Sequence, residues 1–136
     1  MASSRELQLS EALFAAYDIV ARTDEALAPA LREYGITATT AHLLWAIDPG
    51  EPAPSMREAA SRVHCTPQNV TFMCQQLEAR GLVERTTSSA DQRQRVIAIT
   101  PLGRSAREMI VELVSTGSPL ALKDADALER IAGLLR

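Results

Sequence analysis

Residues 55–100 constrain the fold more than any other part of the chain, because two short helical patterns there are followed at once by a hairpin pattern. Ser55 and Glu58 form an S-x-x-E capping box, which predicts a helix of about two turns. We expect this helix to end near His64, where the pattern breaks. Thr66-Pro67 predicts a second start, since threonine caps helices and proline suits their first position. The stretch therefore predicts two helices joined by a tight turn.

The second predicted helix is amphipathic. Its apolar residues recur at helical spacing, and they are Val70, Met73, Cys74 and Leu77. Its other side carries four amides and one aromatic ring, which are Gln68, Asn69, Phe72, Gln75 and Gln76. Arg80-Gly81 predicts the end of the helix, because glycine suits a left-handed cap.

A β-hairpin is expected next, from runs rich in β-branched residues at 82–85 and 96–99 around a polar tip, Thr86 to Arg95. An arginine at such a tip, Arg93, is suited to the minor groove of DNA, where the potential is most negative. Asp91 is spaced to orient the Arg93 guanidinium through an ion pair. The alternative is a solvated hairpin with a surface ion pair of little energetic weight. The two capped helices before the hairpin favour the first interpretation.

The polar side of the second helix is chemically matched to a major groove. Gln and Asn present a donor and an acceptor side by side, as adenine recognition requires. Thr66 can offer its hydroxyl and nearby N–H groups to a phosphate. A merely solvated face is the ordinary alternative, and the neighbouring hairpin favours DNA. Phe72 either touches a thymine methyl or packs against a neighbouring helix, and the amides suggest a preference for A·T-containing half-sites.

Five motifs at their spacing in this chain resemble the MarR family of winged-helix transcriptional regulators: Gly35-Ile36-Thr37, Thr66-Pro67-x-x-Val70-Thr71, Leu77-Glu78-x-Arg80-Gly81-Leu82-Val83, Asp91-x-Arg93 and Ile99-Thr100-Pro101-x-Gly103. The resemblance implies an obligate homodimer on pseudo-palindromic double-stranded DNA, with the second motif helix in the major groove and the wing in the minor groove. Many such proteins repress their own operon until a small molecule or an oxidant arrives. Three positions depart from the family pattern: Ala59 is often leucine, His64 is usually glycine, and Phe72 is often basic.

The expected fold is mostly α with a small β-wing, a winged helix-turn-helix flanked by N- and C-terminal dimerisation helices. One MarR-like domain should span residues 1–136, with dimerisation helices at 1–36 and 101–136 and the DNA-binding lobe at 37–100. The candidate DNA contacts are Thr66, Gln68, Asn69, Thr71, Phe72, Gln75, Arg85, Asp91, Arg93 and Arg95. The candidate effector contacts are the polar-tipped rings Tyr17, Tyr34, His42 and Trp45, although each is more often a core residue.

The terminal helices carry more apolar surface than one small lobe can bury. One face of the first helix holds Leu9, Leu13, Tyr17 and Val20, and another holds Leu7, Phe14 and Ala21. The last helix carries a stripe of Leu128, Ile131 and Leu135. A helix that is apolar on more than one face needs more than one partner. The pattern therefore predicts a homodimer.

The net charge of −3 argues at first against a nucleic-acid partner, but the charges are segregated. Between residues 55 and 107, eight arginines against four carboxylates give +4, which leaves −7 for the rest of the chain. Arginine suits bidentate phosphate contacts. This distribution is typical of a protein with one face toward DNA and an acidic face elsewhere.

Other classes of protein fit the sequence poorly. No metal-ligand spacing, phosphate loop or nucleophile motif is present, so we expect no enzyme activity, metal or cofactor. No unbroken run of about 18 apolar residues and no signal peptide occur, so a cytoplasmic protein is expected. Two alternatives remain: a thiol-based redox regulator using Cys65 or Cys74, and a winged-helix module that binds only proteins. The simpler interpretation is that both cysteines are small, buried hydrophobic residues.

Overall fold

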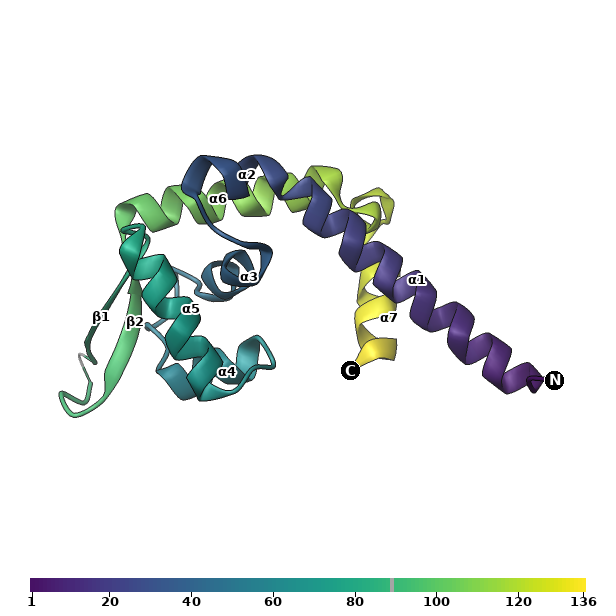
Figure 1. The fold of residues 1–136 in the computed structure, drawn as a ribbon, viewed down its shortest axis with the longest axis horizontal. Coiled ribbons are helices and arrows are strands. Elements are labelled where there is room, and N and C mark those ends of the chain that lie inside the picture. The colour runs from purple at the N-terminus through teal and green to yellow at the C-terminus, as the bar shows by residue number, and fades with distance from the viewer. Residues whose placement is uncertain (89) are drawn as a thin grey trace. The chain divides into compact units, whose positions relative to one another are not determined.

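The computed structural model describes residues 1–88 and 90–136 and divides the chain into two compact units (Figure 1). The terminal unit consists of residues 1–28 and 112–136, and the winged-helix unit consists of residues 29–111. The longest helix of the C-terminal half, α6 (Pro101–Gly117), contributes to both units. In the described part of the chain, no helix is long and apolar enough to cross a membrane.

The winged-helix unit combines short helices with one antiparallel hairpin, in the chain order α2 (Ala28–Tyr34), α3 (Ala38–Ala46), α4 (Met56–Arg62), α5 (Pro67–Ala79), β1 (Val83–Thr87), β2 (Arg95–Ile99) and the start of α6. Helix α5 packs against both α3 and α4, and β1 lies beside α5. The large side chains of its core are fully or almost fully buried, and they include Leu43, Leu44, Ile47, Val70, Leu77, Leu82, Ile97 and Ile110. The predicted fold class, mostly α with a small wing, is confirmed.

Local signals in the sequence set the helix ends. The predicted capping box before α4 is present, with the Ser55 hydroxyl accepting from the Glu58 backbone N–H at 3.1 Å. The predicted cap of α5 is also present, since the Thr66 hydroxyl accepts from the backbone N–H of Asn69 at 3.2 Å. Because these contacts span only three residues, they form wherever the helix forms.

Two residues in the left-handed region produce the sharp turns at the ends of α4 and α5. His64 has φ +54° and lies in the turn between α4 and α5. Gly81 has φ +73° and ends α5 as predicted. This conformation is sterically unfavourable for a non-glycine residue, because its Cβ lies too close to the following carbonyl oxygen. His64 is therefore a strained position between the two motif helices.

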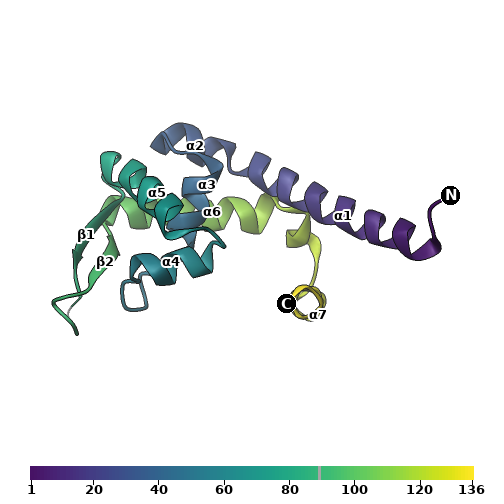
Figure 2. The same ribbon diagram turned by 60° about the horizontal axis from the view of Figure 1, so that its bottom comes forward.

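The wing is longer than its sequence pattern predicted. Strands β1 and β2 pair from Val83↔Ile99 out to Thr87↔Arg95, so Thr86, Thr87 and Arg95 belong to the ladder and not to the tip. The prediction was wrong there because it followed apolar runs, whereas threonine and a paired arginine also suit strands. Ser89, inside the predicted tip, lies outside the described residues. In both views the distal end of the hairpin extends away from α4 and α5 (Figures 1 and 2).

The terminal unit contains α1 (Ser4–Ala26), the end of α6, a 3₁₀ turn η1 (Pro119–Leu122) and α7 (Ala125–Leu135). Gly117 lies against Ala26, and the Thr23 and Ser118 hydroxyls are 2.8 Å apart. No residue of α1 is buried. Its large apolar side chains are about half to three-quarters exposed, and they are Leu7, Leu9, Leu13, Phe14, Tyr17 and Val20.

Candidate nucleic-acid interface

Helix α5 presents the two faces that its sequence predicted. Val70, Met73, Cys74 and Leu77 are at most 4% exposed and face α3 and α4. The residues of the opposite face are exposed, and they are Gln68, Asn69, Phe72, Gln75 and Gln76. The amide groups of this helix are therefore available to an external partner, because the chain does not cover them.

The N-terminal end of α5 uses part of its polar chemistry internally. The Thr66 oxygen caps the helix, so its hydroxyl proton remains available to an acceptor outside the chain. The Thr71 hydroxyl donates to the carbonyl of Pro67 at 2.9 Å, and this residue is half-buried. Thr66, the predicted phosphate contact, is thus better placed to bind DNA through its hydroxyl than Thr71 is.

Phe72 lies on the surface and not in the core. Its side chain is 62% exposed. It borders a groove of about 340 Å³ between α5 and the start of α3, which also includes Thr37, Cys65 and Asn69. An aromatic ring beside amides on an open helix face is suited to apolar contact with a base methyl. The sequence did not indicate this groove, because the start of α3 lies about 30 residues before α5 and only packing brings them together.

The wing tip is organised by contacts within itself. The Asp91 carboxylate accepts from the backbone N–H of Arg93 at 3.0 Å, and the Ser88 hydroxyl accepts from the Asp91 N–H at 3.3 Å. The predicted Asp91–Arg93 ion pair does not occur among the residues that the structure describes. An Asp two residues before an N–H forms a local turn more readily than it reaches a long, solvated guanidinium. Arg93 and Arg95 are both exposed.

Arg85 lies differently from the other predicted contacts. Its Nε donates to the Glu78 carboxylate at 2.7 Å, and the two side chains are only 32% and 30% exposed. The Cys74 thiol lies 3.6 Å from the same carboxylate oxygen. Burial, reinforced by the charge and hydrogen bond of Glu78 and opposed by Arg85, raises the pKa of Cys74 to about 12. This thiol is therefore protonated near neutral pH and a poor nucleophile.

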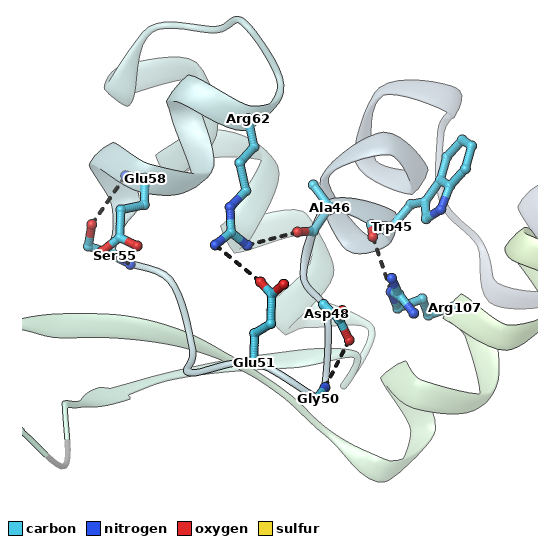
Figure 3. Close-up of polar contacts among 9 residues, drawn as sticks. All are labelled: Trp45, Ala46, Asp48, Gly50, Glu51, Ser55, Glu58, Arg62 and Arg107. Carbon is cyan, nitrogen blue, oxygen red and sulfur yellow. Dashed lines mark hydrogen bonds and ion pairs between the residues drawn. The ribbon is translucent and has the colours of Figure 1, made fainter. Parts of the chain in front are cut away.

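Two more arginines of the basic segment bind the end of α3 (Figure 3). Arg62 donates to the Ala46 carbonyl at 3.0 Å and lies 3.7 Å from the Glu51 carboxylate, while Arg107 donates to the Trp45 carbonyl at 3.1 Å. Cations at a helix C-terminus donate to unpaired carbonyls and interact favourably with the negative end of the helix dipole. The segregated charge is real, but these two arginines and Arg85 have partners within the chain. The count of eight therefore overstates the freely available positive charge.

The four candidate effector residues do not share one compact unit. Tyr17 is 68% exposed on α1 of the terminal unit. In the winged-helix unit, Tyr34 and Trp45 are half-buried, and His42 is exposed on α3. An apolar cavity of about 410 Å³ lies in the terminal unit between α1 and α7. Its lining includes Ile131 and Leu135 of the predicted α7 stripe, together with small α1 residues such as Ala12 and Ala16 that the sequence did not single out.

Comparison with known proteins agrees with this architecture. The MarR family model matches residues 34–94, which cover α3 to β1 and the wing tip. The chain is 21% identical to CouR from Rhodococcus jostii RHA1 bound to p-coumaroyl-CoA, with a TM-score of 0.79 over 98% of this chain and 90% of that one. It is 25% identical to the transcriptional repressor CouR bound to a 23-mer DNA duplex, with a TM-score of 0.76 over 99% and 96%.

A third solved structure is the transcriptional regulator BldR from Sulfolobus solfataricus, at 26% identity and a TM-score of 0.71 over 98% of each chain. No curated protein sequence matches the chain significantly. The solved structures match nearly the full length, so the fold is shared, and the family match lies within the winged-helix unit.

Proposed function

We propose that this chain, whose residues 34–94 match the MarR family model, is a sequence-specific DNA-binding transcriptional regulator of that family. One observation carries the proposal: the exposed amide face of α5 and an exposed, arginine-bearing hairpin belong to the same compact unit. A helix fits the major groove, and an arginine at a projecting tip fits the minor groove. We take the protein to be a repressor acting as a homodimer on a pseudo-palindromic operator.

Each proposed contact has a distinct role. Gln68, Asn69 and Gln75 read base edges, and Phe72 touches a thymine methyl. Thr66 and Thr71 contact phosphates at the start of α5. Arg93 and Arg95 supply charge to the minor groove, and Asp91 shapes the tip through its bond to the Arg93 backbone. Arg85 differs from these contacts because its guanidinium is already paired with Glu78.

The homodimer is supported by the apolar surface of α1. Leu13, Phe14 and Tyr17 are 48%, 72% and 68% exposed, and monomeric soluble proteins seldom leave a large apolar patch exposed to water. Two copies related by a two-fold axis would set recognition helices about 10 base pairs apart, one turn of DNA. Light scattering should give twice the monomer mass, and Phe14→Glu should shift it toward the monomer. A monomeric parent at micromolar concentration would contradict the proposal.

A small-molecule effector is also proposed, with Tyr17, Tyr34, His42 and Trp45 as candidate contacts. CouR is bound to p-coumaroyl-CoA in one structure and to DNA in another, so proteins of this fold accept both kinds of partner. We expect no enzymatic activity or cofactor, and a cytoplasmic location. Release of a bound duplex by one compound of a carboxylate and acyl-CoA panel would identify the effector class.

The decisive experiment measures DNA affinity against salt. A duplex selected from a random pool should bind with a steep log–log salt slope, whose magnitude Arg93→Ala lowers by about 0.9. Gln68→Ala and Asn69→Ala should instead relax base preference at particular positions by ~1–3 kcal/mol each. Arg130→Ala, at an arginine of α7 whose side chain is also exposed, is the matched control and should leave the slope unchanged. If Arg93→Ala alters neither affinity nor slope, the wing does not touch DNA.

A redox-sensing regulator is the second candidate, and it rests on Cys65 alone. Cys65 is half-buried and borders the groove beside Phe72, whereas Cys74 is buried and has a raised pKa. If peroxide releases DNA from the parent but not from Cys65→Ser, the protein senses oxidants through this residue. A protein-only binding module would lack the salt-dependent DNA affinity altogether.

A further inference from the structure

The two strands of the wing are attached to the rest of the winged-helix unit by different kinds of contact. Strand β2 is held by backbone: the Ile97 N–H donates to the Pro54 carbonyl at 2.8 Å, and Ser55 forms a bridge with Val96. The base of the hairpin is held by the Thr100 hydroxyl, which donates to the Gly81 carbonyl at 2.6 Å. Strand β1 is attached through side chains.

Two side chains of β1 face the rest of the unit, and the charged one is Arg85. Side chains alternate along a strand, so Arg85 shares a face with buried Val83, while Glu84 between them is exposed. The guanidinium on this face meets Glu78 in the last turn of α5, at 2.7 Å. With both side chains about two-thirds covered, the pair is less screened by water than a surface ion pair.

The other neighbour of Glu78 makes this ion pair costly to disrupt. The Cys74 thiol, on the buried stripe one turn earlier, donates to the same carboxylate oxygen at 3.6 Å. The carboxylate therefore has one partner on its own helix and one on the wing. If either Glu78 or Arg85 were neutralised, the remaining charge would stay partly desolvated without its counter-ion.

We propose that the Glu78–Arg85 pair is a positioning link: it fixes the orientation of the wing relative to α5, the proposed recognition helix, so that both engage one duplex together. Arg85 then acts through Glu78 and does not touch DNA. This inference rests on the proposed function and assigns a role that a basic residue on a wing strand would not otherwise suggest. A wing without this link would still be anchored through β2, but the direction of its tip would vary.

A double-mutant cycle separates positioning from direct contact. Positioning predicts that Glu78→Gln and Arg85→Gln each weaken binding to the selected duplex about tenfold, and that the double variant binds no worse than either single one. The salt slope should stay at the parent value, because no phosphate contact is lost. Direct contact predicts the opposite pattern: Arg85→Gln lowers the slope by about 0.9, and Glu78→Gln tightens binding by freeing Arg85.

Glu84→Gln is the matched control, since it removes the same charge from the exposed face of β1. It should bind DNA at least as tightly as the parent, and an equal weakening would overturn the proposal. Urea unfolding of every variant shows whether a loss of affinity reflects loss of the fold.

A measurement without DNA distinguishes this inference from the proposed function. Amide NMR of the free protein should show Thr86 and Thr87 shifted and more mobile in Glu78→Gln, but not in Glu84→Gln. If the parent binds no duplex, the proposed function fails while this signature still tests the link. Unchanged wing amides in Glu78→Gln would overturn the link, whatever the DNA affinity.

Discussion

Gly103, in the first turn of α6, lies so close to the base of the wing that no larger residue fits there. A Cβ there would overlap the Leu82 carbonyl oxygen and lie 2.8 Å from the Ile99 side chain. That carbonyl already accepts from the Thr100 N–H at 3.1 Å, and the bond joins the start of the hairpin to the start of α6. Gly103→Ala therefore forces the helix and the wing base apart.

The expected magnitude follows from opposing terms. Replacing a helical glycine by alanine would by itself stabilise the fold by up to ~1 kcal/mol. Overpacking costs about 1–3 kcal/mol, and leaving a buried carbonyl without its donor costs about 1–3 kcal/mol more. With the propensity gain subtracted, we expect a net loss of roughly 1–5 kcal/mol in the free energy of unfolding. The steric terms outweigh helix propensity because the obstacle is backbone, which cannot rotate away.

Equilibrium unfolding in urea at one fixed protein concentration measures this loss, since the stability of an oligomer depends on concentration. Gly133→Ala is the control: Gly133 lies within α7, and a Cβ there meets nothing within 4 Å. That variant should be as stable as the parent or up to ~1 kcal/mol more stable. If Gly103→Ala unfolds at the parent midpoint or above it, the close approach of α6 to the wing base is wrong.

Three further outcomes are expected. Thr66→Ala should lower the free energy of unfolding by about 1 kcal/mol through loss of the α5 cap, and Thr66→Ser should not. His64→Gly should raise the urea midpoint, with a gain of up to ~1 kcal/mol, because φ +54° strains a side chain more than glycine's extra entropy costs. In a Cys65→Ser background, alkylation of Cys74 should stay slow up to about pH 10, and rapid alkylation of the native protein at pH 8 would contradict this. The free energy of unfolding should fall as the pH rises from 9 toward 12, because near pH 9 the Cys74 thiol ionises in the unfolded chain but not in the folded one.

Much of the winged-helix unit was predictable because its signals are local. The caps at Ser55 and Thr66 and the glycine that ends α5 each act within about one helical turn. The buried stripe of α5 follows from the helical period alone, and so does its exposed amide face. The same period on α1 indicated more apolar surface than one chain covers, and the structure leaves that helix with no buried residue.

The tertiary structure decided which charged groups already have partners. Arg62 and Arg107 bind carbonyls 16 and 62 residues away, and no periodicity of the sequence reports such a distance. The sequence predicted Arg85 as a DNA contact, and the packing of β1 beside α5 gives its guanidinium a partner in Glu78 that the sequence did not indicate. The sequence predicted that Asp91 pairs with the Arg93 guanidinium, but in the turn its carboxylate accepts from the Arg93 backbone N–H instead. Capping and amphipathic patterns depend on neighbours along the chain, whereas the partners of long charged side chains depend on how whole elements dock.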